Sequence, residues 1–465
     1  MCNSILYKEE KTEVAIIGAG VSGLASSYFI GHEKCKIFEK SKNAYGLLQS
    51  TEIDGVSWDI GPHLSFTKHR LVRELFEELS NGSFKEFEAL IGNYTNGSWL
   101  PHPIQANLYA LPKAARNQYY DEILCAIRNE KNPEKHKNYA EWLLNAYGNQ
   151  FTSDFVAKYT RKYWTVDPST LTIDWIGARL RPFTEQTLAY SMADSADDTK
   201  HYINKIRYPQ KEGYMRFIKA LVTGASINYE TNITEINLTK KFFITSCGKR
   251  IRFERIISTI PLPEFLKLCH APIDIQKVAS NLSCTSALLV NCVSMSKSTN
   301  PYHWFYVYDE DKFSTRVTDM GNLAPENLAN FNSAFQVEVY ESNYKPFRLT
   351  HKRIAKTVTD ELVKIGVTRS INSYHYKYVK YANIIYDLNY RETVEKILKW
   401  ISGYGLRREE QDLDPITDWS KTKNTELGTV ILAGRHAQWK YFWSDDCVMR
   451  AHEISRSLHI KSKGS

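Results

Sequence analysis

The fold is decided by the stretch Val14-Ala15-Ile16-Ile17-Gly18-Ala19-Gly20-Val21-Ser22-Gly23, which is followed by the apolar segment 24–30. This order predicts a strand, a tight turn and a helix. The first two glycines let the backbone turn sharply and approach a pyrophosphate, and the third lets the helix pack closely on the strand. The helix N-terminus adds unpaired N–H groups and the positive end of a dipole. We therefore expect a dinucleotide to be bound by Gly18, Gly20, Val21, Ser22 and Gly23. A glycine-rich turn in an unrelated α/β protein is the alternative.

A second predicted strand, Cys35-Lys36-Ile37-Phe38, ends on Glu39, 16 residues beyond Gly23. A carboxylate at this position binds ribose hydroxyls in dinucleotide sites of this type. It favours a free 2′-hydroxyl, as in FAD or NAD, over the 2′-phosphate of NADPH. We expect Glu39 and its neighbour Lys40 to belong to the cofactor site.

Composition is typical of a large globular enzyme. The 465 residues predict two to three domains, and 43% of them are hydrophobic. No apolar run approaches the length of a membrane span and no secretory leader is recognised, so we expect a cytoplasmic protein. The eight cysteines show no zinc spacing, and no metal site is expected. The net charge of +8 is scattered rather than gathered in one block, which argues against nucleic acid but would attract an anionic sugar nucleotide.

The segment Asp54-Gly55-Val56-Ser57-Trp58-Asp59-Ile60-Gly61-Pro62-His63 is similar to one in the flavin-dependent superfamily of amine oxidases, protoporphyrinogen oxidases and UDP-galactopyranose mutases. In that superfamily a Gly-Pro-His or similar turn runs under the flavin ring. The resemblance implies FAD as the cofactor, with Gly61, Pro62 and His63 beside the ring. An ordinary turn histidine is the alternative for His63.

The chain is expected to have interleaved domains and an α/β fold. The expected parts are a Rossmann-type, glutathione reductase-like FAD-binding domain, a helical insertion, and a second mixed β-sheet that forms the substrate domain. Strands are predicted at 226–229, 234–238, 250–253, 255–261, 303–308, 335–340 and 429–434, and helices at 141–148 and 446–458. The expected boundaries are 1–75 and 226–265 for the FAD-binding domain, 76–225 for the helix-rich insertion, 266–400 for the substrate sheet, and 401–465 for the closing strand and helix.

The C-terminal stretch Gly434-Arg435-His436-Ala437-Gln438-Trp439-Lys440-Tyr441 resembles the UDP-galactopyranose mutases, in which a Gly-Arg pair precedes an aromatic pair and then acids. The resemblance places Gly434 and Arg435 at the flavin, Arg435 also near the substrate, and Tyr441 at the sugar-nucleotide phosphates. The chain departs from the pattern at Trp443, where the mutases have an acid.

Further segments extend this resemblance. The stretches around Arg316 and around Arg179-Leu180-Arg181-Pro182 match segments whose arginines bind the nucleotide diphosphate, with Arg181 preferred to Arg179. Such a role suits arginine, because its planar fork holds two phosphate oxygens and keeps its charge when desolvated. Two shorter matches, at 209–214 and 380–387, contain Tyr214 and Tyr386, which the resemblance adds to the substrate site.

The resemblance implies an FAD-dependent mutase that converts a nucleotide-activated sugar between pyranose and furanose forms in polysaccharide or glycoconjugate synthesis. Its flavin would act in the reduced form, with NADH or NADPH as external reductant, and His63 would orient the substrate or handle a proton. Two alternatives stay open: a flavin oxidase or dehydrogenase acting on an amine or a sugar, and a non-catalytic flavin-binding partner. Whether the chain forms a homo-oligomer is also left open.

Overall fold

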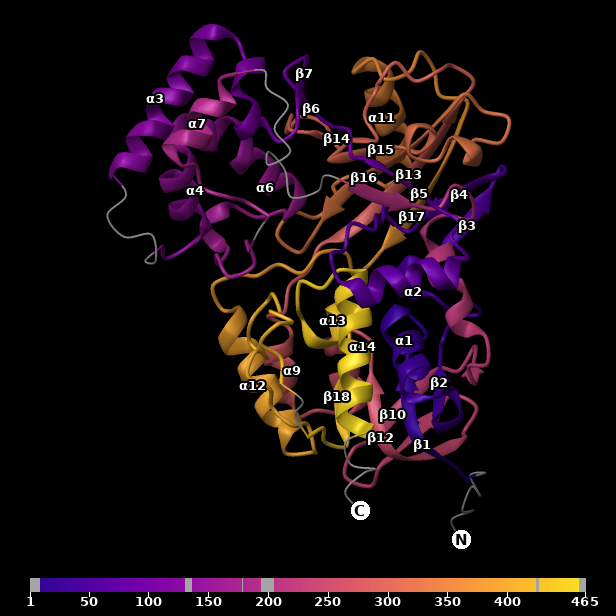
Figure 1. Ribbon diagram of the computed structural model, residues 1–465. Coiled ribbons are helices and arrows are strands. Elements are labelled where there is room, and N and C mark those ends of the chain that lie inside the picture. The colour runs from indigo at the N-terminus through magenta and orange to yellow at the C-terminus, as the bar shows by residue number, and fades with distance from the viewer. Residues whose placement is uncertain (1–8, 130–135, 178, 194–204, 424–425, 460–465) are drawn as a thin grey trace.

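The computed structural model describes residues 9–129, 136–177, 179–193, 205–423 and 426–459. Figure 1 shows one large β-sheet with its helices in the lower half of the molecule and a second sheet in the upper half. A group of helices lies beside the second sheet, at the upper left of the view. None of the described helices is both long and apolar enough to cross a membrane. The sheets and the helices around them together form a mixed α/β fold.

The first sheet is centred on β1, which pairs in parallel with β12 on one side and with β2 on the other. The strand order is β10-β11-β12-β1-β2-β9, and β18 pairs with the C-terminal half of β12. The described strands are β1 Glu9–Ile17, β2 Cys35–Phe38, β9 Ile227–Asn228, β10 Ile233–Asn237, β11 Phe242–Thr245, β12 Arg250–Ser258 and β18 Val430–Leu432.

Helices cover both faces of this sheet, which explains why β1 ends in an unbroken apolar run. Val14 and Ile16 belong to the core formed with α1 and α14. Ala15 and Ile17 point the other way, into the core formed with α8, α9 and α12. The bounds of these helices are α1 Val21–Ile30, α8 Leu262–Leu268, α9 Ile273–Ala279, α12 Tyr390–Ser402 and α14 Ser444–His459.

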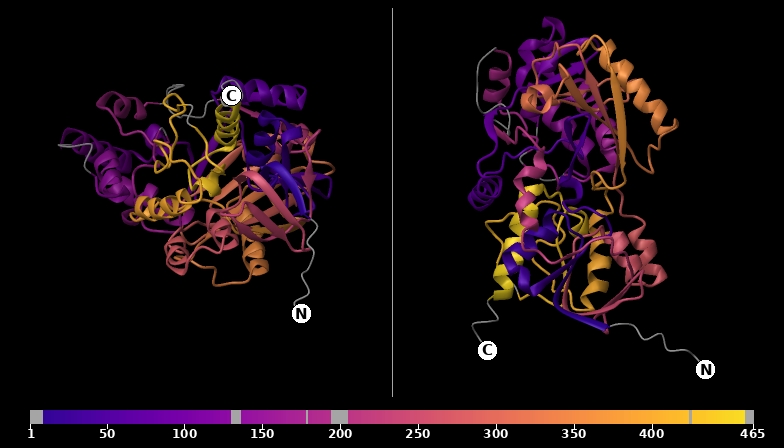
Figure 2. Two further views of the ribbon diagram at one scale, coloured as in Figure 1. Left: turned by 90° about the horizontal axis from the view of Figure 1, so that it is seen from below. Right: turned by 90° about the vertical axis from the view of Figure 1, so that its right-hand side faces the viewer.

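The second sheet has the order β17-β13-β16-β15-β14-β6-β7. Its outer face is covered by α11, His351–Lys364, whose Ile354 and Val358 pack against Leu288 and Val290. Figure 2 shows this helix on the outer side of the sheet in its right-hand view. The opposite face is turned toward the first half of the molecule. The strands are β6 Ile91–Thr95, β7 Ser98–Pro101, β13 Ser286–Ser294, β14 Trp304–Val307, β15 Arg316–Asp319, β16 Ser333–Glu341 and β17 Ser373–Val379.

The helices beside the second sheet bury a dense set of aromatic side chains, including Tyr139, Tyr147 and Phe151. They are α3 Lys113–Asn129, α4 Tyr139–Tyr147, α5 Asn149–Phe151, α6 Ala157–Tyr163 and α7 Glu185–Ser191. Two small antiparallel sheets stand apart from the two large ones: β3 Ser50–Ile53 with β4 Val56–Asp59, and β5 Lys85–Glu88 with β8 Lys205–Tyr208. Three further helices are α2 Arg70–Ser80, α10 Met320–Leu323 and α13 Arg435–Gln438.

The predicted strands and helices are confirmed in type, with bounds that differ by a few residues, except that the strands predicted at 250–253 and 255–261 are one strand, β12, which ends at Ser258. Two elements lie elsewhere than expected. β6 and β7 come from the segment expected to be a helix-rich insertion, yet they extend the second sheet. The segment of β6 shows no alternation of polar and apolar residues, because all five of its residues, including the polar Asn93, are buried. α12 comes from the segment expected to form the second sheet, yet it packs on α9 beneath the first.

Candidate functional site

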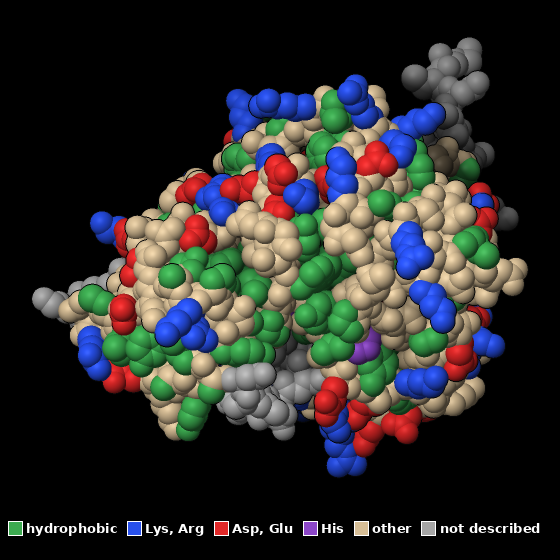
Figure 3. Space-filling view, turned by 90° about the horizontal axis from the view of Figure 1, so that it is seen from above, with side chains coloured by type: hydrophobic (Ala, Val, Ile, Leu, Met, Phe, Trp, Pro, Cys, Tyr) green, Lys and Arg blue, Asp and Glu red, His purple; other side chains and the backbone are tan. Residues whose placement is uncertain are grey.

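A cavity of about 1610 Å³ lies between the two halves of the molecule. Its walls come from the β1–α1 turn, the turn after β4, helix α6, the inner face of the second sheet and the segment that precedes α14. Seen from above, hydrophobic side chains gather around a hollow near the middle of the surface, whereas most charged side chains lie around the rim (Figure 3). A volume of this size exceeds that of an ordinary single-ligand pocket and suits a dinucleotide together with a second molecule.

The β1–α1 turn borders one end of the cavity with Gly18, Gly20, Val21 and Ser22. Helix α1 has no side-chain cap and no acid in its first turn, so its first N–H groups are available to a ligand. A methyl group added at Gly20 would have its nearest neighbour 3.9 Å away, which leaves the backbone open to close approach. Gly23 does not line the cavity. A Cβ there would lie 2.1 Å from the carbonyl oxygen of Gly18, so this glycine serves the packing of helix on strand.

Glu39 follows β2 and is held by two backbone donors. Its Oε2 accepts a hydrogen bond of 2.8 Å from Ala19 N, and its Oε1 accepts one of 2.8 Å from Ser41 N. Each carboxylate oxygen keeps a second lone pair for a ligand hydroxyl. Glu39 and the exposed Lys40 both line the cavity.

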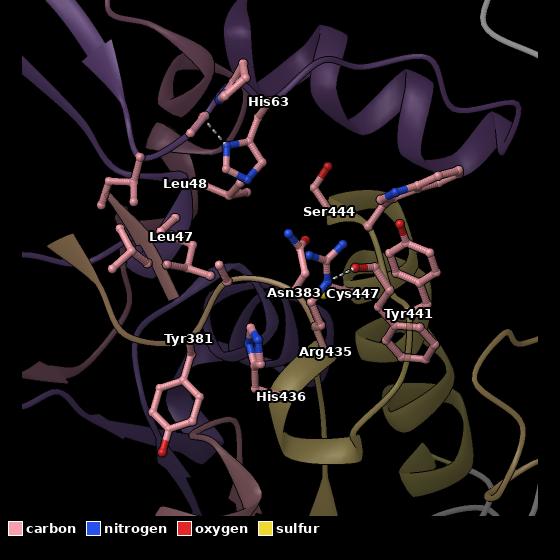
Figure 4. A pocket seen from close by; sticks show the side chains of 18 of the residues that line it. Leu47, Leu48, His63, Tyr381, Asn383, Arg435, His436, Tyr441, Ser444 and Cys447 are labelled. Atoms are coloured by element: carbon pink, nitrogen blue, oxygen red, sulfur yellow. Dashed lines mark hydrogen bonds between the residues drawn. The ribbon is translucent and has the colours of Figure 1, made fainter. Parts of the chain in front are cut away.

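Gly434 and Arg435 reach the same region from the end of β18. Gly434 has a φ of +108°, and a Cβ there would lie 2.4 Å from Ser22 Oγ, so only glycine permits this approach to the start of α1. Arg435 Nε donates a hydrogen bond of 2.6 Å to Phe442 O, which leaves part of its fork available. Figure 4 shows Arg435, Asn383 and His63 extending into one space from three separate segments.

His63 stands after the turn formed by Gly61, which has a φ of +78°, and Pro62. Its Nδ1 lies 2.9 Å from Gly61 O (Figure 4). Because a carbonyl only accepts, Nδ1 carries the proton and Nε2 is left as an acceptor. Burial, reinforced by the charge of Arg435, lowers the pKa of His63 to about 4. The imidazole is therefore neutral at pH 7. Tyr214 packs beside it, with ring centroids 5.6 Å apart.

Arg179 lies against two aromatic rings, which are inclined at 55° to each other. Its guanidinium carbon lies 3.9 Å from the ring centroid of Tyr441 and 4.4 Å from that of Trp443. Its Nη1 donates to Trp175 O at 3.3 Å, and it takes part in none of the ion pairs found within the described ranges. Arg181, two residues on, also borders the cavity but is exposed to solvent.

Arg316 borders the cavity from β15 and is already paired. Its Nε contacts Glu338 Oε2, and its Nη2 donates a hydrogen bond of 2.9 Å to Glu338 Oε1. Tyr340 OH donates a further bond of 2.6 Å to the same Oε1. Glu338 is 4% exposed, so this is a buried, bidentate ion pair.

The remaining predicted residues divide into two groups. Tyr214 and Tyr441 line the cavity, and Tyr214 OH lies 2.7 Å from Ser444 Oγ. Tyr386 does not line it. It is fully buried behind Tyr441, with ring centroids 5.9 Å apart, and its hydroxyl has no hydrogen-bond partner among the residues described. The structure thus brings the predicted residues together around one cavity except Tyr386 and Gly23, which lie in the layer behind it.

Several side chains in the cavity were not singled out from the sequence. They are Tyr159, Tyr163, Tyr306, Glu338, Tyr340, Lys377 and Asn383. One signal was available in the alternating strand 335–340, where Gln336, Glu338 and Tyr340 form the polar face. A polar face on a central strand is compatible with solvent or with a cavity, and the alternation alone does not distinguish them.

Cations outnumber carboxylates around the cavity. Among the described residues that line it, eight are cationic and four are acidic, for a formal charge of +4. The cations are Lys40, Arg179, Arg181, Lys267, Arg316, Lys377, Lys380 and Arg435, and the acids are Glu39, Glu264, Glu338 and Asp445. This balance favours anionic ligands.

Comparisons with solved structures give the same fold. Reduced UDP-galactopyranose mutase superposes with a TM-score of 0.85 at 18% identity, covering 97% of this chain and 94% of that one. A proposed protoporphyrinogen oxidase from Exiguobacterium sp. 255-15 superposes with a TM-score of 0.70 at 15% identity, covering 97% of this chain and 99% of that one. Putrescine oxidase bound to putrescine gives 0.62 at 12% identity, covering 97% and 100%.

Curated relatives match only a short part of the sequence. The zeta-carotene-forming phytoene desaturase of Myxococcus xanthus is 34% identical over 67 residues, which are 14% of this chain and 12% of that protein. The coproporphyrinogen III oxidase of Staphylococcus aureus (strain NCTC 8325 / PS 47) is 36% identical over 70 residues, 14% of this chain and 15% of that protein. The family model described as flavin containing amine oxidoreductase, in contrast, matches residues 22–449. Because this match covers far more than half of the chain, the chain belongs to the flavin containing amine oxidoreductase family.

Proposed function

We propose that this chain uses FAD to act on a nucleotide-activated sugar, as a pyranose/furanose mutase in polysaccharide or glycoconjugate synthesis. The family implies FAD. The structural likeness to reduced UDP-galactopyranose mutase supports a sugar nucleotide as the second ligand. Because one fold hosts several chemistries, the proposal depends mainly on the charges in the cavity.

The residues present fit FAD. Gly18, Gly20, Val21 and Ser22 would hold its pyrophosphate, because the backbone at Gly20 is open and the first turn of α1 has neither cap nor acid. Glu39 would bind the ribose with the lone pairs that Ala19 and Ser41 leave free. When bound, FAD supplies the electron-donating or electron-accepting ring on which the chemistry of the family depends.

The observation that carries the proposal is the surplus of cations, above all Arg179, which forms no ion pair with the residues that the structure describes. A guanidinium packed against both Tyr441 and Trp443 is restrained in orientation and partly desolvated, so it binds a phosphate more strongly than a solvated arginine would. The diphosphate of FAD offsets part of the charge of +4, and a second diphosphate would offset the rest. An amine substrate, being cationic, has no comparable support.

His63 would hold or move a proton of the substrate. Its Nδ1 is fixed on Gly61 O, and its pKa of about 4 keeps Nε2 free to accept a hydrogen bond at neutral pH. Arg179 and Arg435 would position the diphosphate near this histidine. Positioning and electrostatic stabilisation of a leaving diphosphate are the main contributions that the chain's own residues can make.

The same proposal divides the chain into domains. Residues 1–75, 226–265 and 401–465 would form a Rossmann-type, glutathione reductase-like FAD-binding domain, and residues 76–225 and 266–400 the substrate part, apart from α9 and α12, which pack beneath the first sheet. NADH or NADPH would serve as the external reductant.

Anaerobic turnover tests the proposed function. FAD-loaded protein is mixed with UDP-galactose, with and without prior reduction by dithionite. The products are separated, and their masses are measured by mass spectrometry. The proposal expects an isomer of equal mass from the reduced protein only. Bleaching of the oxidised protein on substrate addition, with a product two hydrogens lighter, would instead establish an oxidoreductase. Arg181→Met serves as the matched control for Arg179→Met, which should abolish turnover.

A further inference from the structure

The net positive charge of the protein is concentrated in one segment. Residues 342–389, which lie between β16 and α12, contain nine Lys and Arg and three acids, so they carry +6 of the net charge of +8. The longest basic run in this segment is Lys352-Arg353, so no block of charge marks it in the sequence. The segment forms α11, β17 and the loops around them.

Helix α11 gathers most of these cations on one side of the molecule. Its buried apolar side chains pack on the outer face of the second sheet, and the helix lies on the outside of the molecule (Figure 2). At 3.6 residues per turn, its four exposed cations fall within about 120° of one another around the helix axis. Two more exposed cations flank the helix in the chain. We call these six residues the basic face: Arg348, Lys352, Arg353, Lys356, Lys364 and Arg369.

Acids do not neutralise the basic face. Asp360 is exposed there and accepts from Lys356 at 2.6 Å, and this is the one ion pair that the basic face makes with described residues. Glu361 is buried and turned inward, where it accepts hydrogen bonds from the backbone N–H groups of Phe313 and Ser314. Helices α2 and α12, which also have an exposed side, carry cations and acids in nearly equal number.

The stability of α11 does not account for its cations. Lys352 and Arg353 lie in the first turn, where the positive end of the helix dipole disfavours a cation, and no acid stands in that turn. Lys352 and Lys356 are like charges at i,i+4, which repel each other. Only Lys364, in the last turn, suits the dipole. Cations that weaken their own helix point to an anionic partner outside the chain.

Apolar and amphipathic side chains accompany the basic face. Val363 is 39% exposed on the outward side of α11. Tyr376 and Tyr378 of β17 are each 41% exposed, and the Tyr378 ring stacks on that of His351 in the first turn of α11, with centroids 4.8 Å apart. Tyrosine rings and the long stems of Lys and Arg are typical of the boundary between water and a membrane, because each combines an apolar body with a polar end.

We propose that the basic face docks the protein on a membrane surface that contains anionic phospholipids. Clusters of roughly four to eight Lys and Arg on an amphipathic helix bind such surfaces, and each cation strengthens binding about fivefold. A nucleic acid would match the charge, but α11 has no Asn or Gln to read base edges, and it exposes the aliphatic Val363 among its cations. The basic face lies on the side of the second sheet away from the cavity, so the inference is independent of the proposed function.

Vesicle sedimentation with the FAD-loaded, full-length protein tests the inference. Vesicles of phosphatidylcholine alone are compared with vesicles that also contain phosphatidylglycerol. The face variant replaces three cations of α11: Lys352→Gln, Arg353→Gln and Lys356→Gln. The control variant replaces three exposed cations in the half of the molecule that holds the first sheet: Lys240→Gln, Lys396→Gln and Lys399→Gln.

We expect wild type to bind the anionic vesicles at least about tenfold more tightly than the neutral ones at low salt, and to lose this preference as salt screens the charges. The face variant should lose at least about tenfold in affinity, whereas the control variant should stay within about threefold of wild type. The urea midpoint of the face variant should equal or exceed that of wild type, because first-turn cations oppose the dipole. Arg348→Gln with Arg369→Gln, which leaves α11 unchanged, should weaken binding at least about threefold.

Equal binding to the two kinds of vesicle would overturn the inference, and so would equal losses in the face and control variants. Wild-type affinity after Arg348→Gln with Arg369→Gln would contradict it as well. A short DNA duplex that binds more tightly than the anionic vesicles, and that loses its affinity in the face variant, would show that the basic face takes a nucleic acid instead.

Discussion

Replacing Gly20 by alanine separates cofactor binding from folding. Gly20 has a φ of −73° and a ψ of 179°, a conformation open to any residue. The added methyl group would have its nearest protein atom, Gly46 Cα, at 3.9 Å. Within the protein there is room for it, but it would occupy the space through which a pyrophosphate approaches the start of α1.

The two expected effects differ in size. Alanine stabilises by about 0.4–1 kcal/mol through the unfolded chain, and it loses a similar amount as a poorer N-cap, so the free energy of unfolding should change by less than about 0.5 kcal/mol. A displaced pyrophosphate loses one or two charged hydrogen bonds to backbone N–H groups. At roughly 1.5–3 kcal/mol each, a net loss of about 2–4 kcal/mol corresponds to an FAD affinity lower by roughly 30- to 1000-fold.

The assay combines urea unfolding of the FAD-free protein with titration of FAD, followed by quenching of flavin fluorescence. Gly23→Ala is the matched control, because its Cβ would lie 2.1 Å from Gly18 O and 3.2 Å from Ile16 Cγ2. That variant should lose about 1–3 kcal/mol of stability from overpacking. If Gly20→Ala binds FAD within about threefold of wild type, the β1–α1 turn does not hold the pyrophosphate.

Arg179→Lys should weaken UDP binding by about 1–2 kcal/mol in calorimetry, because an ammonium cannot replace the stacked fork, whereas the exposed Arg181→Lys should change it little. Equal losses in the two variants would contradict this difference. Trp443→Leu, which removes one of the two rings that contact Arg179, should cost UDP binding roughly half as much as Arg179→Lys, and full wild-type affinity would argue against a role for this contact. His63 has a pKa of about 4 when folded and about 6.5 when unfolded, so its contribution to stability is present above pH 6.5 and is lost as the pH falls toward 4. Between pH 7 and 4 the unfolding free energy of the FAD-free wild type should fall by about 2 kcal/mol more than that of His63→Gln. This is less than the full pKa difference gives, because the imidazole faces the cavity. Identical pH slopes in the two proteins would contradict this assignment of the His63 pKa.

Features set by local spacing could be read from the sequence. The strand, turn and helix of residues 14–30 are present, and Gly23 lies against Gly18 O as close packing requires. The family follows from the same kind of motif, and residues 22–449 match it. The roles of the individual site residues stay predictions.

Other features depended on partners distant in the sequence. Arg316 and Glu338 are 22 residues apart, and only the pairing of β15 with β16 makes them neighbours. The sequence resemblance assigned both Tyr386 and Tyr441 to the substrate site, yet Tyr386 is buried behind Tyr441. Motif resemblance marks a segment, but it does not tell which side chain of that segment reaches the cavity.

The β1–α1 turn, the alternating strands and the family can be recognised in the amino-acid sequence, because backbone geometry and side-chain periodicity act over a few residues. The packing of the folded chain, in contrast, places Arg179 against two aromatic rings with no ion pair among the described residues, and it pairs Arg316 with Glu338. In the sequence the two arginines look alike, because each lies in a short motif of similar length. What separates them is desolvation and the nearest opposite charge, and both quantities are set by which strands and helices pack around each guanidinium.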